Sequence, residues 1–331
     1  MKPVALDAMG GDFAPKETVA GALLAAEAGI PVVLVGDQER LARELAEHGQ
    51  SLPIVHAPEA IAMNEHATEV RKKRSASINV AMELVRSGDA VAVASMGHTG
   101  ATMASALFGL GRIPGIERPA PLATFPSASG KLTHLIDGGA NTDCRPSFLV
   151  QFAILGSAYA KLVSGVPNPS VGLLTIGEEE GKGNELAIRT QQLLKNTPGI
   201  NYYGPVEGRD IPTGLVDIVV TDGFTGNVVG KAGEGFIKVM LQWVMETLLE
   251  GLPEEEALRA VSALRGLKTR LDPDELTASP LLGVNGAVII GHGNGKARAV
   301  QRAIERALSL GKAGYVELVR EGVMSLRESQ S

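Results

Sequence analysis

Short apolar runs alternate with amphipathic stretches along most of the chain. The apolar runs predict strands at 4–7, 32–36, 90–95, 122–125, 132–137, 171–176, 218–221 and 287–290. The amphipathic stretches predict helices at 16–28, 39–48, 76–86, 146–163, 185–195 and 296–308. This alternation predicts a three-layer α/β/α fold with a mainly parallel sheet, in which ligands bind beyond the carboxyl ends of the strands.

Three glycine-containing loops, at residues 95–100, 181–185 and 222–227, follow such apolar runs. Each opens a segment with a helical pattern, so backbone N–H groups and short polar side chains come together at helix N-termini. That arrangement suits a bound anion. We expect the loops to converge on one cleft, and they predict phosphate chemistry.

The usual nucleotide signatures do not match. Residues 177–183 resemble a P-loop, but one residue is missing before Lys182, and Gly183 stands where a serine or threonine would hold magnesium. No G-x-G-x-x-G sequence follows a predicted strand. Glycine spacing therefore gives no support for ATP, GTP or NAD.

The alternation breaks at about 234–272, where two helical patterns follow one another around a break at 251–253. The first has a broad apolar face, and the second carries basic residues beside its apolar positions. One interpretation is a helical hairpin in a subunit interface or in the core. The other is a basic amphipathic element that contacts an anionic membrane. We expect one α/β unit over 1–331, with this hairpin as an insertion.

Composition narrows the functional classes. The net charge of −6 argues against a general nucleic-acid binder, and 44% hydrophobic with 21% charged residues is ordinary for a soluble globular protein. Cys144 is the only cysteine, and no apolar run reaches the length of a membrane span. The first residues reach Asp7 too soon for a signal peptide. We therefore expect a cytoplasmic protein, at most peripheral on a membrane.

Candidate ligand-binding residues follow the predicted strands. After the first strand these are Asp7, Gly10, Gly11 and Asp12, although taken alone they favour an ordinary strand-to-helix turn with Asp12 as a helix cap. A second group consists of Ser95, His98, Thr99 and Gly100, where the histidine is either structural or functional.

Three later loops add polar side chains. Lys182 and Asn184 offer a point charge and an amide donor, although Lys182 could simply offset the acidic run 178–180. Asp222, Thr225, Gly226 and Asn227 follow the next predicted strand, and Asn227 could donate to a carbonyl oxygen. His292 lies in the last glycine loop.

Three other features favour plain interpretations. The basic run 71–74 and the arginines at 298, 302 and 306 are typical of solvent-facing surfaces. Cys144 is flanked by Asp143 and Arg145 and has no histidine near it in sequence, which disfavours a cysteine nucleophile.

Together, residues 6–12, 182–186, 222–227 and 282–286 resemble motifs of the bacterial phosphate acyltransferases of phospholipid synthesis. The likeness runs in order from residue 4 to about 310. Members of that family typically carry asparagine at the position of His98. The resemblance implies a fold like phosphotransacetylase and the isocitrate and isopropylmalate dehydrogenases, usually as a homodimer. It also implies peripheral membrane association, which would involve the hairpin.

The implied activity is transfer of a long-chain acyl group from acyl carrier protein to inorganic phosphate. The acyl-phosphate product would serve glycerol-3-phosphate acyltransferase. Such a step requires positioning and electrostatic stabilisation but no metal or redox cofactor, so we expect none. We assign phosphate to the loop at 95–100 with Lys182 nearby, and Asn184, Asn227 and His292 to the carbonyl oxygen.

Several alternatives stay open at this point. The chain could be a phosphotransacetylase that uses coenzyme A thioesters, a dehydrogenase of hydroxy-diacids, or a non-catalytic scaffold on a membrane surface. An acidic carrier would dock on a basic surface, for which 71–74 and 259–270 are the candidates.

Overall fold

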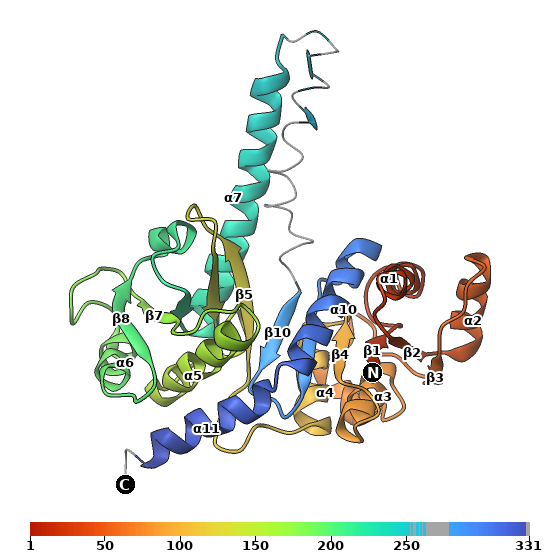
Figure 1. Cartoon of the computed structure of the whole chain (residues 1–331), viewed down its shortest axis with the longest axis horizontal. Coiled ribbons are helices and arrows are strands. Elements are labelled where there is room, and N and C mark those ends of the chain that lie inside the picture. Colours follow the sequence, from red (N-terminus) through yellow and green to blue (C-terminus); the bar gives the residue numbers. More distant parts are fainter. Residues whose placement is uncertain (252, 254–255, 258, 260, 263–277, 329–331) are drawn as a thin grey trace.

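The computed structural model describes residues 1–251, 253, 256–257, 259, 261–262 and 278–328. Within them, eleven strands form one sheet in the order β3-β2-β1-β4-β11-β10-β5-β6-β9-β7-β8 (Figure 1). The strands are β1 (Val4–Asp7), β2 (Val32–Gly36), β3 (Ile54–His56), β4 (Ala92–Ser95), β5 (Ala120–Pro126), β6 (Leu132–Ile136), β7 (Ser170–Leu174), β8 (Asn201–Val206), β9 (Ile218–Val220), β10 (Ser279–Leu282) and β11 (Ala287–Ile290).

The sheet contains two parallel blocks. One consists of β3, β2, β1, β4 and β11, and the other of β6, β9, β7 and β8. Between them, β10 and β5 pair antiparallel with both of their neighbours. The predicted mainly parallel α/β sheet is confirmed, and strand direction reverses between its two blocks.

Helices cover both faces of the sheet. One face carries α1 (Lys16–Glu27), α2 (Gln38–Glu47), α5 (Pro146–Leu162), α6 (Glu185–Lys195), α10 (Ala297–Lys312) and α11 (Tyr315–Glu328). The other carries α3 (Ser77–Arg86), α4 (Thr99–Gly109), α7 (Gly223–Leu249) and the 3-10 helices η1 (Ala67–Arg71) and η2 (Gly208–Thr213). Alternate strand residues point to the two faces, as Leu6 and Ala5 of β1 do.

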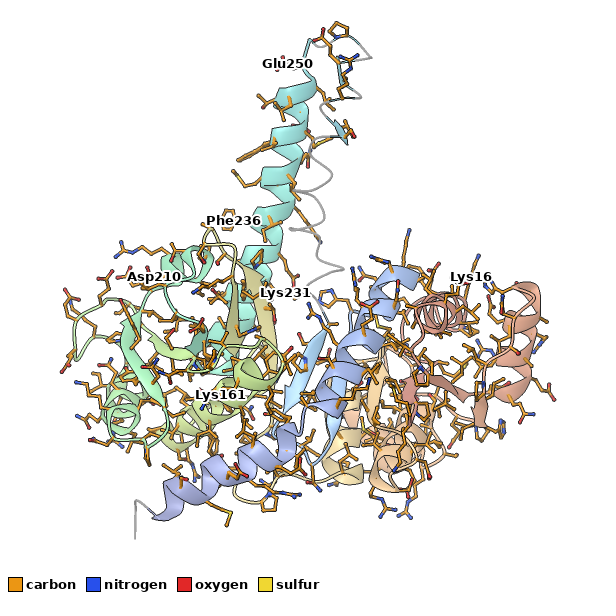
Figure 2. The ribbon with its side chains drawn as sticks, viewed as in Figure 1. Lys16, Lys161, Asp210, Lys231, Phe236 and Glu250 are labelled. Carbon is orange, nitrogen blue, oxygen red and sulfur yellow. The ribbon has the colours of Figure 1, made fainter. Side chains whose placement is uncertain are left out.

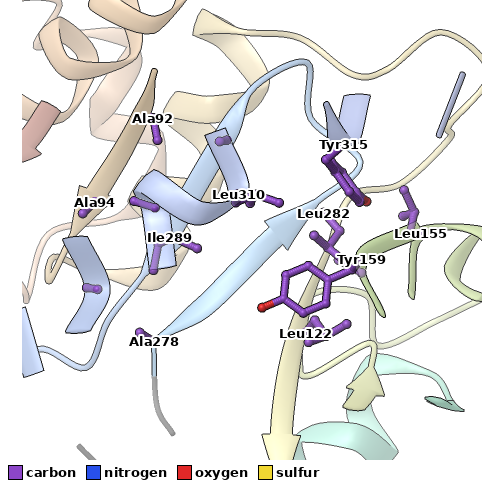
Figure 3. Packing of buried hydrophobic residues seen from close by; sticks show 14 of the residues in the cluster. Ala92, Ala94, Leu122, Leu155, Tyr159, Ala278, Leu282, Ile289, Leu310 and Tyr315 are labelled. Atoms are coloured by element: carbon purple, nitrogen blue, oxygen red, sulfur yellow. The ribbon is translucent and has the colours of Figure 1, made fainter. Parts of the chain in front are cut away.

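The core is continuous across the junction of the two blocks. Figure 3 shows Ile289 of β11, Leu282 of β10 and Leu122 of β5 with Leu155 of α5 and Leu310 of α10. All five side chains are buried. Strands buried on both faces read as unbroken apolar runs, which is why their positions were predictable.

Register brings the ends of the two blocks to one line. Leu281 of β10 pairs with Pro121 of β5, and the neighbouring residue Pro280 pairs with Ile289 of β11. A single row across the sheet therefore runs through Leu6, Ala94, Ile289, Pro280, Leu122, Ile136, Val220 and Leu173. Although the blocks run in opposite directions, their carboxyl ends meet along this row.

Helix α7 is the feature that departs most from a globular outline. Figure 1 shows it rising from the body, and Figure 2 shows Phe236 along it and Glu250 just beyond its end. The predicted first helix of the hairpin begins earlier than expected, because Asp222 caps it at Gly223. It ends at Leu249, before Gly251, whose φ is 74°. Most of the predicted second helix lies outside the described residues.

The elements that were not predicted have local reasons. Strands β3 and β8 are the two edges of the sheet, so they bury less apolar surface. Strand β8 contains Gly204 and Pro205, and β10 contains Pro280, residues that weaken a strand pattern. Among the described helices, none is both long and apolar enough to cross a bilayer.

Candidate active site

Asp7 and Ser95 form a buried hydrogen-bonded pair at the ends of β1 and β4. The Asp7 carboxylate accepts from Ser95 Oγ at 2.7 Å and from Ser77 Oγ at 2.6 Å. Ser95 Oγ in turn accepts from the Gly97 N–H at 3.1 Å. Burial raises the pKa of Asp7, and the two hydroxyl donors oppose that rise. These hydrogen bonds link the ends of β1 and β4 to Ser77, the first residue of α3, so the side chains of Asp7, Ser77 and Ser95 are bonded to one another.

The loop after β1 packs against two other strand-end loops. A Cβ on Gly10 would collide with Asp7 Oδ2 and the Gly97 backbone, so only glycine fits there. Asp12 N–H donates to the Gly293 carbonyl at 2.8 Å. The prediction that Asp12 caps a helix is wrong, because α1 starts at Lys16 with Pro15 at the N-cap position.

His98 is the N-cap of α4. Its Nδ1 accepts from the Ala101 N–H at 3.1 Å, the bond that an asparagine side chain makes at this position. Thr99 and Gly100 are the first residues of the helix. His292, two residues after β11, points its Nε2 toward Glu234 of α7 at 3.9 Å. His98 and His292 therefore both lie just beyond the carboxyl ends of β4 and β11.

The N-terminus of α7 is already occupied by a carboxylate. Asp222 accepts from the Thr225 N–H at 2.9 Å and from Thr225 Oγ1 at 2.7 Å. Gly226 packs so closely that a Cβ would overlap the Asp137 carbonyl oxygen. Asp222 thus caps this helix end, and the expectation that this loop takes part in binding an anion stays a prediction.

The N-terminus of α6 keeps a neutral cap and a nearby cation. Asn184 Oδ1 accepts from the Ala187 N–H at 2.9 Å, and the buried Gln191 fixes the loop by donating to the Lys182 carbonyl at 3.1 Å. Glu178 pairs with Arg209, and Glu180 pairs with Lys195. Lys182 therefore does not offset the acidic run. Its ammonium has no hydrogen-bond or ion-pair partner in the described part of the chain.

These two helix ends flank a small cavity of about 130 Å³. Its polar lining comes from Thr175, Asn184, Thr221, Asp222 and Thr225. We call it the α6–α7 cavity. It joins the two later loops that were predicted to bind ligand.

Asn227 does not line this cavity. It follows Thr225 by two residues, a rotation of about 200° around α7. Its side chain lies against Gly139 on the other side of the helix, and its amide has no internal partner among the described residues. Phe224 lies between Asn227 and Thr225 on the outer surface of the first turn and is 65% exposed.

The predicted residues therefore form two groups along one row. Asp7, Gly10, Gly11, Asp12, Ser95, His98, Thr99, Gly100 and His292 lie at the β1, β4 and β11 ends. Lys182, Asn184, Asp222, Thr225, Gly226 and Asn227 lie at the β7, β9 and β6 ends. Five strand intervals of about 4.8 Å separate Ser95 from Thr221 by about 24 Å. Lys182 follows β7, which is six strand positions from β4, so the sheet order places its loop away from the Ser95 loop, and their joint binding of phosphate stays a prediction.

The loop after β6 was not singled out from the sequence. Asp137 is fully buried and accepts from the N–H groups of Gly139, Ala140 and Asn141 and from Asn141 Nδ2, all at 2.7–2.8 Å. Asn141 O accepts from the Gly223 N–H at 2.7 Å, which fixes the start of α7. The signal in the sequence was an aspartate and two glycines after an apolar run, as at Asp7.

Cys144 behaves as a structural thiol. It donates weakly to the Asn141 carbonyl at 3.3 Å, and burial together with the charge of Asp137 raises the pKa of its thiol to about 11. It is therefore protonated at neutral pH, which agrees with the prediction that it is not a nucleophile. Over the described residues, no cluster of His, Cys, Asp and Glu side chains could hold a metal ion.

The basic run at 71–74 consists of two lysines in ion pairs and two arginines at a concave surface. Lys72 bonds Glu69 at 2.7 Å, and Lys73 bonds Glu65 at 2.6 Å. Arg71 stacks over Phe108 with 4.2 Å between the guanidinium carbon and the ring centroid. Arg71 and Arg74 line a concave surface of about 750 Å³. The solvent-facing interpretation thus fits Lys72, while the two arginines remain available to a partner.

Comparison with known proteins gives a consistent result. The model of the family described as "Fatty acid synthesis protein" matches residues 2–318. A phosphate acyltransferase of Thermus thermophilus is 53% identical over 98% of this chain and 99% of its own length. That of Pelotomaculum thermopropionicum is 49% identical over 98% and 95%.

Solved structures agree on the fold. A phosphotransacetylase from Streptococcus pyogenes superposes with a TM-score of 0.62 at 17% identity, covering 96% of this chain and 94% of its own. A 4-hydroxythreonine-4-phosphate dehydrogenase from Klebsiella pneumoniae gives 0.59 at 13% identity, covering 94% and 100%. At these identities the likeness shows the fold alone. The family match and the full-length relatives show that the chain belongs to the phosphate acyltransferase family and is an acyltransferase of fatty acid and lipid synthesis.

Proposed function

We propose that this chain transfers a long-chain acyl group from the thioester of acyl carrier protein to inorganic phosphate. The observation that carries the proposal is Lys182, whose ammonium has no partner within the described residues and which adjoins the neutral N-terminus of α6. A helix N-terminus and a lysine together favour a bound dianion. This assignment moves phosphate from the Ser95 loop to the α6–α7 cavity.

The reaction step is balanced without a cofactor. A phosphate oxygen attacks the thioester carbon and forms the new C–O bond, and the C–S bond breaks. The proton of hydrogen phosphate passes to the departing thiolate, which gives acyl-phosphate and the free carrier thiol. Much of the phosphate is dianionic at neutral pH, so the protein's main task is to position the reactants and stabilise the oxyanion.

Two amides flank the thioester in this proposal, and that of Asn184 supports the developing oxyanion. Asn184 keeps its Nδ2 group free of the cap bond, because only Oδ1 accepts from Ala187. Asn227 has an unpartnered amide, among the described residues, on the other flank of the first turn of α7. A thioester whose carbonyl lies at Asn184 would extend across the first turn of α7 toward Asn227. Asp7, Ser95 and His98 lie at the ends of β1 and β4, several strands away, and take no part in bond making in this proposal.

The carrier and the later steps are also proposals. For an acidic carrier protein we propose docking at Arg71 and Arg74, which line a concave surface. Acyl-phosphate would then pass to glycerol-3-phosphate acyltransferase. The rival donor is coenzyme A, as in a phosphotransacetylase, and a scaffold role would require no turnover at all.

The outer part of α7 supports a homodimer. Phe236, Met240 and Trp243 are exposed and lie within about 60° of one another around the helix. An apolar face of this size on a projecting helix favours a partner, and we propose a second copy of the chain. Peripheral contact with the inner face of the plasma membrane is proposed for the end of the hairpin.

The direct test uses purified protein with palmitoyl-acyl carrier protein, with and without phosphate. We expect release of free carrier thiol and of acyl-phosphate, both dependent on phosphate. Release without phosphate would instead indicate a thioesterase. Turnover of palmitoyl-coenzyme A but not of the carrier would favour a phosphotransacetylase. No turnover of either donor would favour a non-catalytic scaffold on a membrane surface.

A further inference from the structure

The α6–α7 cavity is too small for a long acyl chain. Its volume of about 130 Å³ corresponds to roughly four water molecules at about 30 Å³ each. In the proposed reaction, phosphate and the reacting carbonyl occupy that space. The rest of a long-chain substrate must therefore lie on the adjoining surface.

Exposed apolar side chains border this cavity. Ile176 lines it and is nevertheless 82% exposed. Phe224 stands between the lining residues Asp222 and Thr225 and is 65% exposed, and Val228, one helical turn further on, is 53% exposed. Because β7 and β9 are neighbours, with Leu173 opposite Val220, the Ile176 loop and the start of α7 lie side by side.

The rotation of α7 connects these side chains into one surface. Thr225, Val228, Phe236 and Trp243 lie within about 80° of one another around the helix axis. The face that borders the cavity is therefore the face that carries the apolar side chains upward. A face about 100° away from it packs on the body through glycine: Gly226 lies against Leu135, and Gly233 lies against Phe125.

We propose that Ile176, Phe224 and Val228 form the binding surface for the acyl chain beyond its first few carbons and set the preference for long chains. This inference rests on the proposed acyl transfer. The thioester carbonyl lies at Thr225, and the chain runs over Phe224 and Val228 along α7. Phe236, Met240 and Trp243 further along the helix remain for the second copy.

The test compares palmitoyl and butyryl groups on the same carrier protein, so that docking is constant. Phe224→Ser should lower kcat/KM for the palmitoyl donor by about 10-fold or more, the loss expected for removing one large apolar contact. The value for the butyryl donor should stay within about twofold. Ile176→Ser should shift the ratio of the two donors in the same direction.

Tyr203→Ser is the matched control, because Tyr203 is also exposed but lies on the edge strand β8. It should leave the ratio unchanged. Equal losses for both donors in Phe224→Ser, or no loss for either, would overturn the chain-binding surface while leaving acyl transfer intact. Absence of phosphate-dependent transfer by the unaltered protein would overturn the proposed function itself. Thermal melts of each variant verify that the fold is retained.

Discussion

Replacing His134 by glutamine should remove a measurable part of the acid sensitivity of folding. His134 lies on β6 and is only 2% exposed. Its Nδ1 is 3.1 Å from Thr124 Oγ1, and its Nε2 is 2.8 Å from Ser164 Oγ. Burial, aided by the charge of Arg306 and opposed by Asp217, lowers the pKa of His134 from 6.5 to about 4.

The size of the effect follows from proton linkage. Above pH 6.5 the imidazole is neutral in both the folded and the unfolded chain, so it does not make stability depend on pH. As the pH falls below 6.5, the unfolded chain binds a proton that the folded chain takes up only near pH 4. This difference reduces the free energy of unfolding by about 2 kcal/mol at pH 5 and about 3 kcal/mol at pH 4.

Urea unfolding at pH 7.5 and pH 5 measures this difference. The stability gap between the natural chain and His134→Gln should change by about 2 kcal/mol between the two pH values, in favour of the variant at pH 5. Buried Asp7 and Asp137 titrate in both proteins and cancel in the comparison. His48→Gln, at an exposed position, is the control. A gap that stays constant with pH would refute a depressed His134 pKa.

Three further changes test other parts of the structure. Gly226→Ala should lower the free energy of unfolding by about 1–3 kcal/mol and lower turnover, because its Cβ would push α7 away from Asp137. In the control Gly230→Ala the new Cβ meets nothing within 4 Å, so this variant should be slightly more stable than the unaltered chain. Equal melting curves for the two variants would contradict this. Met240→Glu with Trp243→Glu should convert a dimer to a monomer by light scattering, and Lys238→Glu should not; an unchanged mass would argue against α7 as the interface. Arg71→Glu with Arg74→Glu should raise KM for the acyl carrier substrate at least about tenfold at low salt, whereas Lys72→Glu, already paired with Glu69, should change it little; salt-independent binding would exclude this surface.

Much of the fold could be predicted because its central strands are buried on both faces. Runs such as Val32–Gly36 and Ala287–Ile290 are entirely buried, so their composition is uniform. Edge strand β8 has a mixed burial pattern and contains Gly204 and Pro205, so its hydrophobic pattern does not predict a strand. The reversal between the two blocks depends on the pairing of β10 with β5, a long-range contact that no local pattern encodes.

The site was predictable as a set of loops but not as a geometry. Asp222, Asn184 and His98 all stand where caps are expected, and each does cap a helix. The charge of the capping residue decides whether the helix end favours an anion. The order of the strands decides which loops are neighbours, and the local sequence does not encode that order. Lys182 and Ser95 therefore appeared close in sequence reasoning, although six strand positions separate β7 from β4.

The most direct test of the account is the phosphate saturation curve of Lys182→Ala with palmitoyl-acyl carrier protein as donor. Loss of the ammonium should lower kcat/KM for phosphate by about 10²–10³-fold, the usual cost of removing one preorganised group that stabilises charge in the transition state. Lys195→Ala is the control: it removes the lysine at the end of α6, which is paired with Glu180, and kcat/KM for phosphate should stay within about twofold. Near-normal turnover and phosphate affinity in Lys182→Ala would contradict the assignment of phosphate to the α6–α7 cavity.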